Sequence, residues 1–204
     1  MRIITLSRQF GSGGREIAKR LSDELGIAYY DNEIITEIAA RENLDAGYVE
    51  RTLENGFQWN IPIHYARTIS YIPIDREAGK LLATQHVIMK EIAARGDAIF
   101  VGRAADVVLR EHMPFRIFIY ADMAARVARC QARGGAERLS DKQMEKKIRL
   151  IDKNRALGYD MVSALAWGDK EAYDLCINTG NVEIKKIVPL IAEYAREFFK
   201  GREK

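Results

Sequence analysis

The sequence has few cysteines and no long hydrophobic run, and each shortage excludes a class of protein. Cys130 and Cys176 are its two cysteines, no Cys-x-x-Cys pair occurs, and the three histidines do not have metal-ligand spacing. A zinc site is therefore not expected, and both thiols are predicted to be buried core residues in a reducing cytoplasm. No apolar run reaches the roughly 18 residues of a membrane-spanning helix, and the segment after Met1 is patterned as a core strand, not as a signal peptide.

The composition favours one folded domain. Of the 204 residues, 48% are apolar and 30% are charged, and a balance of this kind argues against disorder. The net charge of +3 is small, and the basic residues are spread along predicted helices instead of forming a tract. We therefore expect no nucleic-acid or membrane partner, while formation of a homo-oligomer stays open.

A glycine-rich segment near the amino terminus organises the rest of the chain. Residues 2–6 are apolar and β-branched, and apolar residues recur at helical spacing over 15–25, so a loop joins a strand to a helix. Glycines let backbone N–H groups turn inward, and the helix start adds unpaired N–H donors and a positive dipole. Together they predict a phosphate cradle, although a plain strand-to-helix turn shows the same pattern. The predicted phosphate-binding residues are Gln9, Phe10, Gly11, Ser12, Gly13, Gly14, Arg15 and Glu16.

The loop departs from the G-x-x-x-x-G-K-[ST] pattern of nucleotide-binding loops. With the last glycine of the pattern aligned to Gly14, Gln9 replaces the first glycine, Arg15 the lysine and Glu16 the hydroxyl residue. Arg15 can still hold phosphate oxygens as a planar fork. A carboxylate beside phosphate is repulsive unless a cation lies between them, so Glu16 is a candidate Mg²⁺ ligand.

The apolar runs predict a five-stranded parallel sheet with helices on both faces, which is a three-layer α/β fold. The predicted strands are 2–6, 27–30, 98–102, 115–120 and 174–178. The predicted helices are 15–25, one that begins after Asp31 and Asn32, 44–55, 81–95, a short one ending at 109, 122–133, 140–156 and 181–199.

Two segments interrupt this regular pattern. Pro189 is expected to kink the last helix or to split off its first turns. Residues 57–73 show no periodicity and are expected to form a substrate-covering insertion. Trp59 and Tyr71 in that segment, and Gln85 beyond it, are candidate contacts to a base or sugar, although packing is the commoner role for such residues.

Candidate catalytic residues follow the strands, because ligands bind at the carboxyl ends of parallel strands. Asp31 can hold Mg²⁺ through water or accept a proton, and its alternative role is to cap a helix. Arg103 can grip an acceptor phosphate in bidentate fashion, or can be a surface arginine. Lys153 and Arg155 belong to a basic stretch that could close over phosphates, although such stretches usually form a solvated face.

Several of these stretches together resemble the cytidylate kinase-like family of bacterial P-loop kinases. The resemblance is carried by Ser7-Arg-Gln-Phe-Gly-Ser-Gly-Gly-Arg-Glu16, Ala28-Tyr-Tyr-Asp31, Ile99-Phe-Val-Gly-Arg-Ala-Ala-Asp106 and Asp174-Leu-Cys-Ile-Asn-Thr179. It extends over nearly the whole chain and implies a nucleoside monophosphate kinase fold in one domain, residues 1–204. The implied parts are a core of 1–35, 81–135 and 172–204, an NMP-binding insertion at about 36–80 and a lid at about 136–171.

The resemblance also implies roles for individual residues. The loop from Gln9 to Glu16 corresponds to the loop that binds ATP phosphates, and Asp31 corresponds to the aspartate after the second strand. Arg103 corresponds to an arginine that binds the acceptor phosphate, and Lys153 and Arg155 fall where the lid carries arginines. ATP, Mg²⁺ and CMP or dCMP are the implied substrates and cofactors.

Phosphoryl transfer from ATP to a nucleoside monophosphate is the leading hypothesis. Arg15 and Glu16 motivate an alternative, a nucleotide-binding regulatory module with weak or no turnover. A P-loop kinase that acts on another small-molecule acceptor is a further alternative. A dinucleotide oxidoreductase is disfavoured, because Glu16 occupies the place of the third glycine in that fingerprint.

Overall fold

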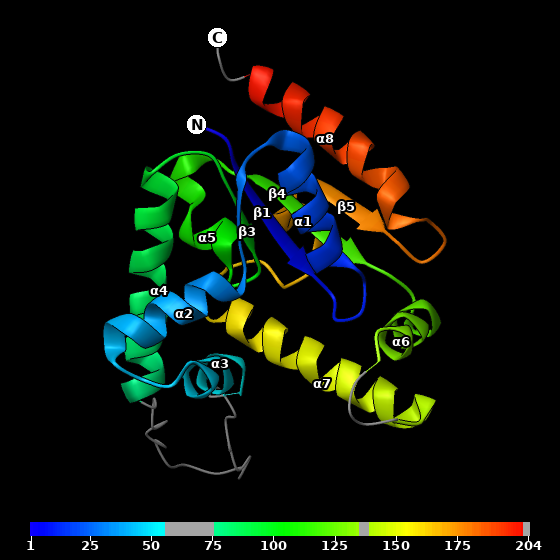
Figure 1. The fold of residues 1–204 in the computed structure, drawn as a ribbon, viewed down its shortest axis with the longest axis horizontal. Coiled ribbons are helices and arrows are strands. Elements are labelled where there is room, and N and C mark those ends of the chain that lie inside the picture. Colours follow the sequence, from blue (N-terminus) through cyan, green and yellow to red (C-terminus); the bar gives the residue numbers. More distant parts are fainter. Residues whose placement is uncertain (56–75, 135–138, 202–204) are drawn as a thin grey trace, which may run out of the picture.

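A parallel sheet forms the centre of the protein (Figure 1). The computed structural model describes residues 1–55, 76–134 and 139–201. The strands are β1 (Ile3–Arg8), β2 (Ala28–Tyr30), β3 (Ala98–Val101), β4 (Phe115–Tyr120) and β5 (Leu175–Asn178). They pair in the order β2-β3-β1-β4-β5, and every pairing is parallel. The predicted three-layer α/β fold is therefore confirmed.

The helices keep close to their predicted positions. They are α1 (Gly14–Leu25), α2 (Asn32–Glu42), α3 (Ala46–Asn55), α4 (Arg76–Ala94), α5 (Ala105–Val108), α6 (Met123–Ala132), α7 (Asp141–Asp160) and α8 (Ile184–Lys200), with short 3₁₀ turns η1 (Arg110–His112) and η2 (Lys170–Ala172). Local chemistry sets their ends: Gly26 closes α1 in the left-handed conformation, and a capping box of Ser140 and Gln143 opens α7. Helix α4 begins earlier than predicted and α7 ends later, because Ala78 and Tyr159 in the added turns are buried.

Alternate side chains of the strands enter separate cores on the two faces of the sheet. Ile4 and Leu6 of β1 pack with α1 and α8, whereas Ile3 packs with α2 and α4. In Figure 1, α8 and α1 lie on one side of the sheet, and α4, α2 and α3 lie on the other. The sheet is therefore covered on both faces, as parallel sheets require.

Two expectations about individual residues need correction. Of the two effects expected of Pro189, the split does not occur, because helix α8 runs through the proline. One proline removes a single intrahelical bond, whose acceptor belongs to the exposed Lys185. The kink stays a prediction. Cys176 is exposed and Cys130 is half-buried, so they are not two core thiols. Cys176 faces outward because its neighbours in edge strand β5, Leu175 and Ile177, turn toward the core.

Some expectations lie outside the described residues. The irregular segment 57–73, with Trp59 and Tyr71, is among them. The division into core, insertion and lid stays a prediction, in which α2 and α3 belong to the insertion and α7 to the lid. Within the described residues, no helix combines the length and apolar character that crossing a membrane would take.

Because all strands run in the same direction, their carboxyl ends share one edge of the sheet. The phosphate loop leaves β1 there, and Asp31, Gly102 and Thr179 follow β2, β3 and β5 at the same edge. Helix α7 contacts both α3 and α6, and in Figure 1 it runs below the sheet, on the side of this edge. The predicted convergence of the candidate residues is thus realised by the topology.

Candidate active site

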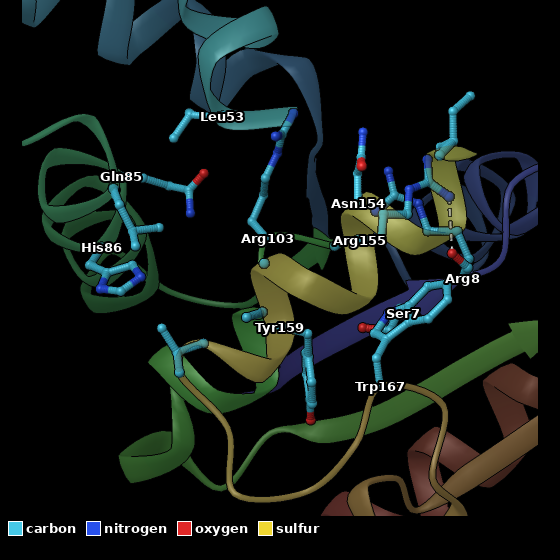
Figure 2. Close-up of a pocket in the computed structure, with 16 residues that line it drawn as sticks. Ser7, Arg8, Leu53, Gln85, His86, Arg103, Asn154, Arg155, Tyr159 and Trp167 are labelled. Carbon is cyan, nitrogen blue, oxygen red and sulfur yellow. Dashed lines mark hydrogen bonds between the residues drawn. The ribbon is translucent and has the colours of Figure 1, made fainter. Parts of the chain in front are cut away.

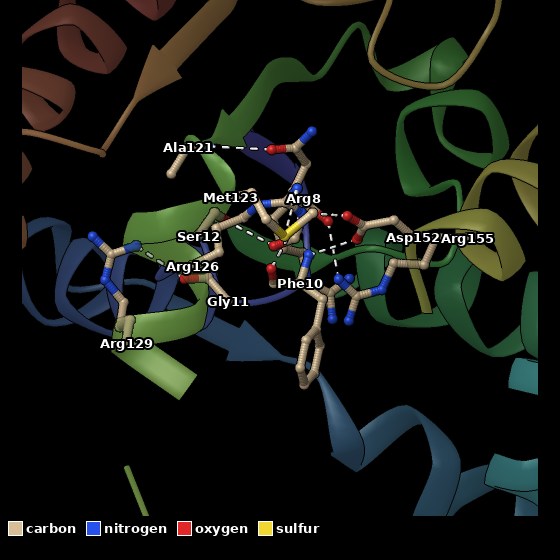
Figure 3. Close-up of polar contacts among 11 residues, drawn as sticks. Arg8, Phe10, Gly11, Ser12, Ala121, Met123, Arg126, Arg129, Asp152 and Arg155 are labelled. Atoms are coloured by element: carbon tan, nitrogen blue, oxygen red, sulfur yellow. Dashed lines mark hydrogen bonds and ion pairs between the residues drawn. The ribbon is translucent and has the colours of Figure 1, made fainter. Parts of the chain in front are cut away.

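The phosphate loop is held from outside by side chains that bind its carbonyl groups (Figure 3). Arg129 of α6 donates to the Gly11 carbonyl at 2.9 Å and also to the Thr179 carbonyl at 2.9 Å. The Thr179 hydroxyl donates to the Ser12 carbonyl at 2.6 Å. Gly13 takes a φ of 86°, which only glycine adopts without strain, and α1 begins at Gly14. With the carbonyls held in this way, the loop amides at the start of α1 are left for an anion.

The Gln9 and Ser12 amides of the loop donate to the Ile119 and Gln9 carbonyls, and a third loop amide has its partner on α7. The Phe10 amide donates to Oδ1 of Asp152 at 2.7 Å, and Oδ2 of Asp152 forms an ion pair with Arg126. Arg155, one turn along α7, donates to the Arg8 carbonyl at 3.0 Å and lies over the Phe10 ring, 5.6 Å from its centroid. These contacts join α7 to the loop (Figure 3).

Asp31 is at the N-cap position of α2, yet its side chain forms no capping hydrogen bond. Its carboxylate forms an ion pair with Arg15 and lies 3.5 Å from a terminal nitrogen of Arg8, and the Tyr29 hydroxyl donates to it at 3.1 Å. Asp31 is 3% exposed. The capping interpretation is therefore wrong, because arginines take the carboxylate.

Arg15 lies at the outer side of the site. Its side chain is 57% exposed and reaches back to Asp31 and to the Asn32 side chain, which it meets at 3.3 Å. Gly14, not Arg15, is the residue that follows the last left-handed glycine of the loop. The structure thus brings Arg15 together with Asp31, and its contact with donor phosphates stays a prediction.

Arg8 is a site residue that the sequence pattern did not reveal, because it lies between the predicted strand 2–6 and the glycines and matches no motif position. Its side chain is 12% exposed, and within the described residues Asp31 is the acidic group that it meets. Burial, followed by the nearby charge of Arg155, lowers the pKa of Arg8 to about 9. A buried arginine that shares the Asp31 carboxylate with Arg15 is suited to bind an additional anion.

Arg103 enters the site on a strained segment. Gly102, Arg103 and Ala104 all have positive φ values, of 70°, 60° and 50°. Such backbone is costly for residues with a side chain and is concentrated at functional sites. Arg103 lines a pocket together with Arg8 and Arg155, and Figure 2 shows it reaching into that pocket. Arg103 and Arg155 are therefore brought together as predicted.

Lys153 is not brought to this pocket. It is exposed on α7, whereas its neighbours Asn154 and Arg155 line the pocket. Arg149, another basic residue of this stretch, lies one turn before Lys153 on α7 and is exposed as well. This arrangement fits the solvated-face alternative for the stretch, and the role of Lys153 stays a prediction.

The far wall of the pocket is formed by α4 (Figure 2). Gln85 is 2% exposed, and neither its Oε1 nor Nε2 of His86 has a hydrogen-bond partner in the described part of the chain. Burial, followed by the charge of Lys90, lowers the pKa of His86, so its imidazole is neutral at pH 7. Buried polar atoms without partners are uncommon in proteins, and at a pocket wall they suit a ligand.

The two predicted magnesium ligands fit the ion unequally. Glu16 binds Arg20 at 2.9 Å on the surface of α1. Oδ1 of Asp31 is buried and accepts no hydrogen bond within the described residues, so it can accept one from a metal-bound water. The described ranges contain no cluster of three carboxylate, histidine or cysteine side chains that could hold a metal ion. Mg²⁺ commonly binds through one carboxylate and substrate phosphates, and Asp31 fits that mode.

Comparison with known proteins agrees with this geometry. A family model described as the cytidylate kinase-like family matches residues 3–181. A cytidylate kinase of Saccharolobus islandicus (strain L.S.2.15 / Lassen #1) is 24% identical over 193 residues, which are 94% of this chain and 89% of that protein.

Solved structures share the fold. A protein of Eubacterium ventriosum has a TM-score of 0.71 and 22% identity, with 96% of this chain and 99% of that chain covered. A shikimate kinase of Bacteroides thetaiotaomicron has a TM-score of 0.54 and 15% identity, with 98% of each chain covered. The structural matches support the P-loop kinase fold, and the family match supports a phosphotransferase.

Proposed function

The chain belongs to the cytidylate kinase-like family, and from that membership we propose that it transfers the γ-phosphoryl group of ATP to a nucleoside monophosphate. CMP and dCMP are the first acceptors to test, because the cytidylate kinases that the chain resembles carry that name. The reaction breaks the bond between the γ-phosphorus and its bridging oxygen and forms a bond to an oxygen of the acceptor phosphate. Its products are ADP and a nucleoside diphosphate.

The observation that carries the proposal is the position of the arginine-lined pocket beside the phosphate loop. Arg8 and Arg155 belong to the pocket wall, and Arg155 also contacts Phe10 of the loop. An acceptor phosphate held by Arg103 would therefore lie next to donor phosphates on the loop. In-line transfer needs this proximity more than it needs a covalent role for the protein.

The roles of the side chains follow from their places. The loop amides and Arg15 bind donor phosphates, and Arg103 orients the acceptor phosphate through charge-assisted hydrogen bonds. Arg155, and Lys153 after a shift of α7, neutralise charge on the group in transfer. Mg²⁺ that binds with ATP supplies further charge neutralisation, and Asp31 is the carboxylate that would hold it through water.

Gln85 is suited to read the acceptor base. Its buried amide lies on the wall opposite Arg103, with Oε1 lacking a partner within the described residues. A pyrimidine that carries an exocyclic amino group offers the donor that this oxygen lacks, whereas the corresponding carbonyl of UMP offers none. We therefore expect preference for CMP over UMP.

A coupled ADP-release assay tests the proposal. Purified protein with Mg·ATP is assayed against CMP, dCMP, UMP, AMP and GMP, and against shikimate and gluconate as non-nucleotide acceptors. CMP or dCMP should give the highest kcat/KM, and the diphosphate product should be seen by ³¹P NMR. Turnover of shikimate or gluconate alone would overturn the nucleotide assignment. ATP binding without transfer to any acceptor would favour the regulatory module.

A further inference from the structure

Arg8 occupies the space that a side chain at position 14 would enter. A Cβ added to Gly14 would lie 2.6 Å from Cβ and 2.9 Å from Cγ of Arg8. Gly14 is the first residue of α1, directly after the left-handed Gly13. A side chain at this place would therefore start where the arginine stem already lies.

A second glycine makes room for the other end of Arg8. A Cβ at Gly102 would collide with the guanidinium, and the closest atom would be Nη1 of Arg8. Gly102 lies at the end of β3, far from Gly14 in the sequence. Two glycines from separate elements thus form a slot that fits one extended arginine, whose head lines the acceptor pocket.

The helix start fixes how the loop matches the lysine-bearing pattern. When Gly13 is taken as the last glycine of G-x-x-x-x-G-K-[ST], Arg8 is at the first glycine and Gly14 is at the lysine. The position that normally carries the cation has no side chain, and the position that normally has none carries a cation. The charge has therefore moved from the helix start to the end of the strand.

We infer that Arg8 performs the role of the missing lysine, a further positioning and charge-neutralising residue that contacts the β- and γ-phosphate oxygens of ATP. This inference rests on the proposed kinase function. Arg8 donates hydrogen bonds and transfers no proton, and the bonds made and broken are those of the phosphoryl transfer. As a planar fork, it can also contact the acceptor phosphate, which a lysine ammonium at position 14 would do less readily.

Exchange of the two side chains tests the inference. The variants are Arg8→Gly, Gly14→Lys and the double variant Arg8→Gly with Gly14→Lys, which supplies the first glycine and the lysine of the pattern and keeps Arg15 at the Ser/Thr position. Arg196→Gln, which removes an exposed arginine of α8, is the matched control. Two readouts are used: the dissociation constant of the non-hydrolysable analogue AMPPNP with Mg²⁺, by calorimetry, and kcat/KM for ATP with the best acceptor.

We expect opposite signs for Gly14→Lys in the two backgrounds. In the wild type it should weaken AMPPNP binding, because Arg8 already fills the space, and in the Arg8→Gly background it should recover at least about tenfold of the lost affinity. Arg8→Gly alone should lower kcat/KM by about 10²–10³-fold, the usual effect of losing one group that stabilises transition-state charge. Arg196→Gln should lie within about threefold of the wild type in both readouts.

The same sign for Gly14→Lys in both backgrounds would overturn the inference, as would AMPPNP affinity in Arg8→Gly within about threefold of the wild type. If thermal unfolding shows that Arg8→Gly does not fold, Arg8→Lys and Arg8→Gln decide instead, and equal AMPPNP affinity for these two would overturn the inference. The inference and the proposed function can fail independently. If AMPPNP binding depends on Arg8 but no nucleotide accepts the phosphoryl group, only the proposed acceptor is refuted.

Discussion

The phosphate loop and the acceptor pocket are neighbours, yet they satisfy their polar groups in opposite ways. The loop carbonyls of Gly11 and Ser12 receive hydrogen bonds from Arg129 and Thr179. In the pocket, by contrast, Gln85 presents a buried oxygen that has no partner among the described residues. The protein itself fixes the shape of the loop, whereas a ligand must complete the pocket. Removal of a polar group should therefore destabilise the fold on the loop side and leave stability nearly unchanged on the pocket side.

The largest expected effect is that of Asp152→Ala. This change removes the acceptor of the Phe10 amide and leaves Arg126, which is 6% exposed, without its carboxylate. Loss of one partner of a buried ion pair costs about 3–5 kcal/mol of unfolding free energy. Urea unfolding checks this value. Glu145→Ala on the same helix removes only a surface pair with Arg149 at 3.8 Å and should cost less than about 1 kcal/mol. If the two variants lost the same unfolding free energy, the contact of Asp152 with the Phe10 amide would not stabilise the loop as proposed.

Thr179→Val should have the next largest effect. The hydroxyl is buried, donates to the Ser12 carbonyl at 2.6 Å and lies 3.1 Å from the Tyr120 carbonyl. Valine keeps the shape but leaves a buried acceptor unpaired, which costs about 1–3 kcal/mol. Thr36→Val, at an exposed position of α2, is the control and should lie within about 0.5 kcal/mol of the wild type. If Thr179→Val lost no more unfolding free energy than Thr36→Val, the loop would not depend on this hydrogen bond.

Gln85→Met sharpens the comparison from the pocket side. It replaces a buried amide, whose oxygen lacks a partner within the described residues, by an apolar side chain of similar length. The unfolding free energy should stay within about 1 kcal/mol of the wild type or rise, because an unsatisfied group is removed. The KM for CMP should rise about tenfold, since one hydrogen bond to the base is lost. Destabilisation beyond about 2 kcal/mol, with the KM unchanged, would make Gln85 a packing residue.

Asp106→Asn should have the smallest effect, visible as a change of stability with pH. Asp106 is 5% exposed and accepts from the Tyr159 hydroxyl at 2.6 Å behind the pocket. Burial raises the pKa of Asp106, while the hydrogen bond from Tyr159 and the charge of Arg116 lower it to a lesser extent. The folded state therefore holds the proton more tightly than the unfolded state, whose pKa is 3.8. This stabilising contribution is full below the unfolded pKa and is lost as pH rises through the raised folded pKa.

Asparagine is neutral at every pH and still accepts from Tyr159. Asp106→Asn should therefore be more stable than the wild type at pH 7.5, by a margin that narrows as pH falls toward 4.5. Urea unfolding of both proteins at each pH measures this margin. A margin that widens at low pH would mean that the carboxylate is stabilised in its charged form. His86→Gln at the pocket wall provides a control in which the pKa shift has the opposite direction.

Much of the fold could be predicted because local and periodic signals agree. The apolar runs located each strand, and the capping box at Ser140 located the start of α7. The parallel order then placed Asp31 and Arg103 at one edge without any knowledge of contacts. These predictions rest on backbone direction and side-chain alternation, which a sequence shows directly.

The details of the site could not be predicted in the same way, because they depend on which side chain fills which space. Arg15 follows the glycines, but the helix begins one residue earlier and turns Arg15 toward Asp31. Arg8 lay in the stretch that leads out of the predicted strand 2–6, and only the tertiary structure shows it within the slot of Gly14 and Gly102. Asp152 lies in a stretch in which the basic residues were predicted to close over phosphates. In the structure, however, the carboxylate of Asp152 accepts a hydrogen bond from the loop. No local pattern encodes these pairings.

The slot of Gly14 and Gly102 has a consequence for how this chain can diverge. Side chains at positions 8, 14 and 102 would occupy one volume. A lysine at position 14 would clash with the arginine while the arginine persists, and a larger residue at position 102 would displace the guanidinium. A lineage that lost the arginine first would pass through a protein with neither cation. A protein with only one of these substitutions should therefore bind ATP less well than a protein with either complete arrangement. Relatives should carry the arginine at position 8 with glycines at 14 and 102, or a lysine at position 14 without the arginine, and mixed combinations should be rare.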